Sequence, residues 1–409
     1  MEWFSQNAAL VGVAIMPLTY GFVGWFTNLV ALKMTFYPLK FIGIWEPWLG
    51  WQGIVPRKAS GLALKSVQML TEKLFKVEEF FEKVDAEKLY EQFKPVLPET
   101  VPEATRHIID EMHPKLKSQL QESDIEKIIE RACHESEQKL HEITGHLKED
   151  IGKVFNFKTL VLRHLTGDNV HRIVDIFQAV GHKEFKFIEK SGLYFGALLG
   201  GVQIVLWHFF PLWWTLPIQG VIVGYLTNWL ALTMIFRPLR EKSFGFIRYQ
   251  GLFLKRQTDV ADKYAELFAT QVLSARNIMD EILYRRVARS VVDTIQEDVA
   301  AMLKEKDPHG KMANEIIHAQ DTTQSSKKEA IAKITEKLSC QAATMEKIMG
   351  RAMNVRNMIF QRMKELPPED FEPILRTAFQ EDEYILILLG AVLGALVGLG
   401  QGVYMFMAG

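Results

Sequence analysis

Polar side chains that could bind a ligand stand inside segments of this chain that are otherwise apolar. They belong to two Thr-Asn pairs and two separate glutamines: Thr27, Asn28, Thr227, Asn228, Gln203 and Gln401. An amide buried without a partner costs a few kcal/mol, so each of these side chains needs a hydrogen bond. They could line a site for a solute or a lipid headgroup, or they could join neighbouring helices. The second interpretation is favoured, and the first stays open.

Motifs of catalysis or cofactor binding are absent from the sequence. The chain contains no GxxxxGK[ST], HExxH, GxSxG or CxxC stretch. Four residues could be imagined as zinc ligands, but their spacing on a charged helix favours a solvated surface: Cys133, His134, His141 and His146. A net charge of -1 disfavours nucleic-acid binding. We therefore expect no enzymatic activity, no metal and no cofactor.

The segments that carry the polar side chains are predicted to be membrane-spanning helices. Charged residues make up 24% of the chain, yet residues 3–32, 191–236 and 384–409 contain no Asp, Glu, Lys or Arg. Since about 20 apolar residues cross a bilayer core, these windows fit one span, a hairpin of two spans and a final span. Four buried helices of a soluble protein are the alternative, which the length of the middle window disfavours.

Aromatic and basic residues predict how the spans are oriented. All nine tryptophans lie in or beside the apolar windows, as expected of rings that settle at headgroup level. Lys and Arg flank the windows on one side only, at 33–58, 183–190 and 237–256. The positive-inside rule thus predicts that both long polar segments are cytoplasmic and that both termini face outward.

The chain contains two related copies of one pattern. The stretch 17–39 returns 200 positions later as 217–239, and the stretch 196–203 returns 198 positions later as 394–401. Each copy holds two predicted spans, so both copies enter the bilayer in the same direction. Such parallel repeats are related by an axis along the membrane normal.

The predicted fold is therefore an all-α membrane protein made by tandem duplication, with two spans per repeat and two long, coiled-coil-like cytoplasmic segments. Apolar residues spaced by three and four, from Ile129 to Val154 and from Ile278 to Leu303, predict these long helices. No strand pattern is long enough to predict a sheet. The expected regions are transmembrane helix 1 (1–40), an interfacial segment (41–58), cytoplasmic helical domain 1 (59–190), a transmembrane hairpin (191–236), a second interfacial segment (237–256), cytoplasmic helical domain 2 (257–383) and transmembrane helix 4 (384–409).

Glycines recur at four-residue spacing in the second and fourth spans. The two stripes occupy equivalent places in the two copies: Gly192, Gly196 and Gly200, and Gly390, Gly394 and Gly398. A stripe of this kind lets two helix backbones approach closely in lipid, where van der Waals contact replaces the hydrophobic effect. We expect tight helix packing, within the chain rather than between chains.

Each interfacial segment is short, aromatic and closed by Gln-Gly and a basic pair. The first contains Trp45, Trp48 and Trp51. We expect these segments to lie in the headgroup layer, with four cations on anionic lipid phosphates: Arg57, Lys58, Lys255 and Arg256. A plain loop at the membrane edge fits the same residues.

Several stretches resemble a known protein family. They are GWFTNLVALKMTFYPL, GYLTNWLALTMIFRPL, LPPEDFEPILRTAFQEDE at 366–383 and the GALVGLGQ stretch near the end. With the Gln-Gly and basic pairs, they are similar to the uncharacterised bacterial membrane family of YheB type, domain of unknown function 445. The resemblance implies a multi-pass protein of the bacterial inner membrane with long cytoplasmic helices. It implies no activity, substrate or catalytic residue.

Two functions fit the sequence. The favoured one is a membrane scaffold whose cytoplasmic helices recruit a protein partner or self-associate, because nearly two thirds of the chain lies in the polar segments. The alternative is a transporter or lipid-handling protein with a site at the repeat interface. No acidic residue stands in an apolar window to couple protons, which disfavours a proton-driven transporter. Anionic membrane lipids are expected partners in both cases.

Overall fold

The computed structural model describes residues 8–46, 48–74, 76–82, 84–112, 121–149, 151, 155–210, 212–244, 247–306, 320–341, 350, 353–380 and 383–408. Most of them are helical, as the sequence predicts. The chain forms two compact units. Unit 1 comprises Met1–Leu74, Leu162–Phe268 and Asn357–Gly409, and unit 2 comprises Phe75–Val161 and Ala269–Arg356. Each polar segment of the sequence therefore contributes to both units.

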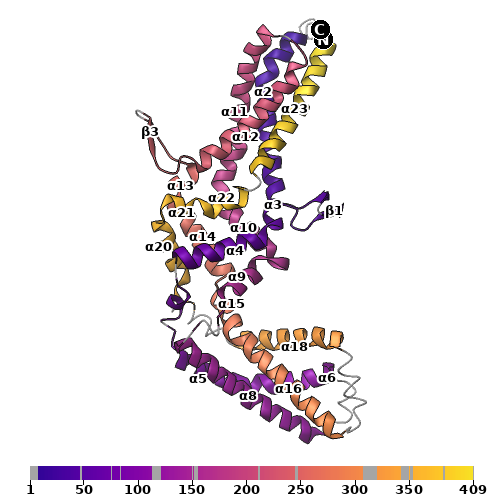
Figure 1. Ribbon diagram of the computed structural model, residues 1–409, viewed down its shortest axis with the longest axis vertical. Helices are drawn as coiled ribbons and strands as arrows, with labels where there is room; N and C mark the ends of the chain where they lie inside the picture. Colours follow the sequence, from indigo (N-terminus) through magenta and orange to yellow (C-terminus); the bar gives the residue numbers. More distant parts are fainter. Residues whose placement is uncertain are drawn as a thin grey trace. The chain divides into compact units, whose positions relative to one another are not determined.

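Unit 1 contains four long apolar helices: α2 (Ala8–Phe36), α11 (His182–Phe209), α12 (Thr215–Phe236) and α23 (Glu383–Ala408). They lie side by side, and α2 begins at the end of the bundle where α23 ends (Figure 1). α2 packs mainly on α11, and α12 packs mainly on α23. In the described part of the chain, these four helices are long and apolar enough to cross a membrane.

Apolar side chains occupy both the inside and the outside of this bundle. Met16, Tyr20, Leu216 and Val223 form a buried cluster between the helices. Large apolar side chains also point outward from all four helices, among them Leu18, Phe22, Leu198, Ile222, Leu388 and Met407. Backbone polar groups are satisfied within each helix, so such a bundle can be surrounded by lipid. This distribution fits a membrane protein.

Shorter helices follow the bundle in both halves of unit 1. The first half supplies α3 (Ile54–Arg57), α4 (Ala59–Met69), the π-helical turn η1 (Leu70–Leu74), the 3-10 turn η5 (Gly167–Asn169) and α10 (Val170–Val180). The second half supplies α13 (Leu252–Lys255), α14 (Gln257–Gln271), α21 (Pro368–Phe371) and α22 (Pro373–Gln380). Helices α9 (Phe157–Leu165) and α20 (Val355–Glu365) link the two units along the chain. Because α22 packs on α3 and α4, the two halves meet below the bundle.

Two short β-hairpins leave the ends of α2 and α12, where the sequence predicts no sheet. Strands β1 (Ile42–Trp45) and β2 (Leu49–Trp51) pair antiparallel, as do β3 (Lys242–Phe244) and β4 (Ile247–Tyr249). Strands of three or four residues are too short to show an alternation of apolar and polar residues. The class stays all-α, with these two hairpins added.

Unit 2 consists of packed helices. They are the 3-10 turn η2 (Val77–Phe80), α5 (Ala86–Phe93), the 3-10 turn η3 (Lys94–Val96), α6 (Leu97–Met112), α8 (Glu122–Glu149), α15 (Ala275–Met279), the π-helical turn η6 (Asp280–Tyr284), α16 (Arg285–Lys306) and α18 (Gln320–Gln341).

The two predicted apolar stripes lie inside unit 2. Helix α8 packs on α16, and Ala132, Leu140 and Ile143 of α8 are buried, as are Val287 and Val291 of α16. The apolar spacing thus identifies which face of each helix is buried. The end of the first stripe, at position 154, lies outside the described residues.

Candidate functional site

The glycine stripe of α11 contacts the backbone of α2. A Cβ atom on Gly192 would overlap the carbonyl oxygen of Gly24, and one on Gly196 would overlap the carbonyl oxygen of Tyr20. A Cβ atom on Gly200 would come within 2.8 Å of the Pro17 Cα atom. All three glycines are buried. The absence of a side chain is therefore what allows this approach.

The equivalent stripe of α23 contacts α12 in the same way. A Cβ atom on Gly394 would overlap the carbonyl oxygen of Gly220, and one on Gly398 would overlap that of Leu216. At Gly390 the added atom would come within 2.7 Å of the Gly224 oxygen. The spacing within each stripe does not by itself identify Gly24, Gly220 and Gly224 as its partners. The similarity of the two stretches does point to Gly24 and Gly224, because these two glycines occupy equivalent positions in 17–39 and 217–239.

The Thr-Asn pairs lie at these same contacts. Asn28 is 1% exposed, and its Nδ2 atom donates to the carbonyl oxygen of Ile188 at 2.5 Å, across the α2–α11 contact. Asn228 is 4% exposed and lies against Gly390, whose added Cβ atom would be 2.5 Å from its Nδ2 atom. The hydroxyls of Thr27 and Thr227 donate to carbonyls of their own helices. These four side chains are thus placed between or along packed helices.

The two glutamines differ in their surroundings. The Nε2 atom of Gln203 donates to the Tyr20 hydroxyl at 2.9 Å, which joins α11 to α2 inside the bundle. Gln401 stands at the equivalent place on α23 and is half-buried. The residue equivalent to Tyr20 is Gly220, so the second copy has no phenol at that place. The two halves are therefore not identical in their polar contacts.

The four predicted lipid-binding cations differ in how exposed they are. Arg57 and Lys255 are exposed, whereas Lys58 and Arg256 are half-buried. The guanidinium of Arg256 donates to the Glu184 carboxylate at 2.5 Å, and the Glu184 side chain is 2% exposed. Arg256 therefore has a protein partner that ties α11 to the end of α13. Sequence spacing alone does not reveal this pair, which is 72 residues apart.

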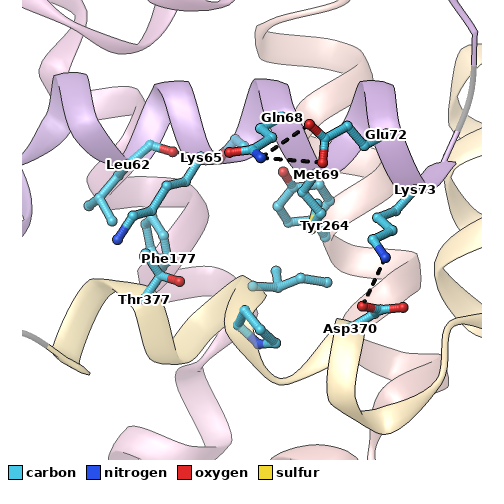
Figure 2. A pocket seen from close by; sticks show the side chains of 13 residues that line it. Leu62, Lys65, Gln68, Met69, Glu72, Lys73, Phe177, Tyr264, Asp370 and Thr377 are labelled. Atoms are coloured by element: carbon cyan, nitrogen blue, oxygen red, sulfur yellow. Dashed lines mark hydrogen bonds and ion pairs between the residues drawn. The ribbon is translucent and has the colours of Figure 1, made fainter.

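A pocket of about 220 Å³ lies below the bundle, where α4 and η1 meet α10, α14, α21 and α22 (Figure 2). Leu62, Phe177, Tyr264 and Ile374 are its most buried lining residues. Charged and amide side chains stand at its rim, namely Lys65, Gln68, Glu72, Lys73 and Asp370. Both halves of the sequence contribute to this pocket, and no motif or spacing in the sequence predicts its residues.

The lining of this pocket combines apolar and charged side chains. Lys73 and Asp370 point toward each other with an Nζ–Oδ1 distance of 3.4 Å, and Gln68 donates to Glu72 (Figure 2). The Tyr264 hydroxyl is buried near Ser66 without a hydrogen bond of good geometry. Burial raises the pKa of Tyr264 well above its ordinary value, so the phenol stays protonated. The pocket can hold a small apolar group with a polar head.

Comparison with protein-family models gives no match for this chain, and comparison with curated proteins gives none either. The resemblance to the YheB-type family therefore stays a prediction from the sequence.

Proposed function

We propose that this chain is a membrane-anchored, non-enzymatic scaffold, in which the four long helices form a rigid base and the polar helices recruit a partner or self-associate. The proposal rests on the hydrogen bonds that polar side chains of the apolar helices make with helix backbones and side chains. Asn28 and Gln203 bond the neighbouring helix, and Thr27 and Thr227 bond their own helix. The amide donors and hydroxyls are thus used in helix packing, whereas the buried amide oxygens of Asn28 and Gln203 have no hydrogen-bond partner among the described residues.

The proposal includes a location and a topology. The apolar outer surface of the bundle supports insertion in a bilayer, and the one-sided Lys and Arg support cytoplasmic polar helices with both termini outside. The family resemblance is the basis for placing the protein in a bacterial inner membrane. The duplication is supported by elements whose bounds differ by 198, such as α3 (Ile54–Arg57) and α13 (Leu252–Lys255).

A second function is favoured by one specific observation. The pocket between α4, α14 and α22 is built from both halves of the chain and combines an apolar floor with a charged rim. A lipid-handling protein with a site at the repeat interface would have such a pocket. This alternative requires that a ligand occupies the pocket and that losing the ligand changes function.

Alanine substitution at Asn28 and Asn228 separates the two functions. If the amides hold helices together, Asn28→Ala and Asn228→Ala should each lower the free energy of unfolding by about 0.5–2 kcal/mol. The lipids that co-purify with the protein should stay unchanged. Thr19→Ala is the matched control, because the Thr19 hydroxyl is exposed and bonds only within α2. Melting in detergent and mass spectrometry of bound lipids provide the two measurements.

A double variant that melts like the wild type but loses one specific lipid or solute would overturn the scaffold proposal. In that case the amides would belong to a binding site, and the lipid-handling function would be preferred.

A further inference from the structure

The β1–β2 hairpin exposes an unusual amount of apolar surface. Ile44 is 95% exposed, Trp48 is 82% exposed, and Ile42 and Trp45 are each 68% exposed. Leu49, on the second strand, is 59% exposed. A patch of this kind on a ten-residue hairpin is expected to be covered by a partner or by lipid. Its place at the end of α2 puts it where an apolar helix leaves the bilayer.

The hairpin is fixed to that helix end by three hydrogen bonds. The indole Nε1 atom of Trp51 donates to the carbonyl of Met34 at 3.2 Å, and the Gln52 Nε2 atom donates to the carbonyl of Leu39 at 2.8 Å. The backbone N–H of Gly53 donates to the carbonyl of Pro38 at 3.0 Å. The hairpin therefore has a defined attachment to the end of α2, and its strands project from the side of the helices (Figure 1).

The second hairpin has the same attachment but different side chains. Tyr249 donates to the carbonyl of Met234 at 2.9 Å, Gln250 to that of Leu239 at 2.9 Å, and the backbone of Gly251 to that of Pro238 at 3.0 Å. The Gln-Gly pair of each copy thus serves the same clamp. Where the first hairpin exposes Ile44 and Trp45, the exposed side chains of the second include two cations, Lys242 and Arg248.

We propose that the two hairpins are membrane-surface contacts with separate roles: β1–β2 inserts its aromatic and aliphatic side chains at the headgroup boundary, and β3–β4 binds anionic headgroups. Trp favours this boundary, aliphatic side chains such as Ile enter the acyl layer just beneath it, and Lys and Arg are attracted to anionic phosphates. The occupant is a lipid bilayer, because the apolar hairpin continues directly from an apolar helix and the cationic one starts from the equivalent point. The inference rests on the proposed function in one respect, that the four helices span a bilayer.

Single-site fluorescent probes in lipid nanodiscs test both roles. In a background with Cys133→Ser and Cys340→Ser, an environment-sensitive dye is attached at Ile44→Cys on the first hairpin or Ser243→Cys on the second. Ile222→Cys on the outer face of α12 is the control for the bilayer core, since Ile222 is 51% exposed and lies about two turns from the start of the helix. Glu126→Cys on an exposed face of α8 is the control for water.

The dye at position 44 should show blue-shifted emission and strong quenching by lipids with a shallow nitroxide, in neutral and anionic nanodiscs alike. The dye at position 243 should be shielded from the neutral quencher acrylamide several-fold better in nanodiscs of phosphatidylglycerol than in those of phosphatidylcholine. Adding Lys242→Glu and Arg248→Glu should remove that difference while leaving the dye at position 44 unchanged.

The controls separate the two ways of failing. If the dye at 222 is in hydrocarbon while the dye at 44 behaves like the one at 126, the hairpin proposal is overturned and membrane insertion stands. If the dyes at 44 and 222 both behave like the one at 126, membrane insertion fails as well. An unchanged acrylamide response at 243 in the two lipids would overturn the headgroup role of β3–β4.

Discussion

At the scale of single residues, glycines in one helix differ in what surrounds them. Gly196 and Gly394 face a carbonyl oxygen of the neighbouring helix, so a side chain has no space there. Gly201 and Gly400, on the same two helices, have no atom within 4 Å of an added Cβ atom. The helical spacing of the glycines, rather than their number, therefore decides which of them are needed for packing.

Gly196→Leu or Gly394→Leu should lower the free energy of unfolding by at least about 1–3 kcal/mol, because the leucine side chain forces two backbones apart. Gly201→Leu and Gly400→Leu are matched controls and should melt close to the wild type. Thermal unfolding in one detergent measures all four variants. Equal melting of Gly196→Leu and Gly201→Leu would mean that the stripe does not form the α2–α11 contact.

Tyr264 provides a second prediction for a single residue. A buried hydroxyl without a good hydrogen bond costs about 1–3 kcal/mol, so Tyr264→Phe should be as stable as the wild type at neutral pH or slightly more stable. The raised pKa of Tyr264 also predicts the direction in which stability changes at alkaline pH. The unfolded chain loses the phenol proton near pH 10.0 while the folded chain keeps it, so the stability of the wild type falls above that pH.

Tyr264→Phe should therefore lose less stability than the wild type as the pH rises above 10.0. Denaturant unfolding across that range measures the difference. Tyr384→Phe is the control, because Tyr384 is 65% exposed. A marked loss of stability in Tyr264→Phe at neutral pH would show that the hydroxyl has a partner that stabilises the fold.

At the scale of elements, one buried ion pair fixes the start of α11 to the end of α13. Glu184 is almost fully buried, and Arg256 supplies its charge partner. Removing one member of such a pair leaves an uncompensated buried charge, which costs about 3–5 kcal/mol. Arg256→Met should therefore be strongly destabilising. The double variant Glu184→Met with Arg256→Met should recover most of the loss.

Lys255→Met is the matched control, since Lys255 is exposed and adjacent in sequence. We expect it to unfold within about 0.5 kcal/mol of the wild type. Chemical unfolding of the four proteins, wild type and three variants, completes the comparison. If Arg256→Met were no less stable than Lys255→Met, Arg256 would be a surface cation, as the sequence analysis expected.

At the scale of the whole molecule, the topology can be measured directly. All Lys and Arg near the apolar helices stand on one side, which predicts that Thr215 faces outward and that Ser123 is cytoplasmic. In a chain without native cysteines, Thr215→Cys should react with an impermeant maleimide added to intact cells. Ser123→Cys should react only after the membrane is permeabilised. Labelling of Ser123→Cys in intact cells would reverse the proposed orientation.

The sequence by itself determined the features that depend on local composition and periodicity. Windows without charge predicted the four long helices, because a helix needs no distant partner to satisfy its backbone. The three- and four-residue spacing in α8 and α16 identified their buried faces, as with Ala132 and Val287. The glycine stripes of α11 and α23 were likewise visible, because equivalent residues recur in the two copies.

Only the tertiary structure decided which distant segments meet. It paired each stripe with its partner helix, joined Glu184 to Arg256, and assembled one pocket from α4, α10, α14, α21 and α22. It also formed the two hairpins, whose strands are too short for a periodic signal. These contacts depend on side-chain shape and on hydrogen bonds between residues far apart in the chain, and one sequence contains no measure of either.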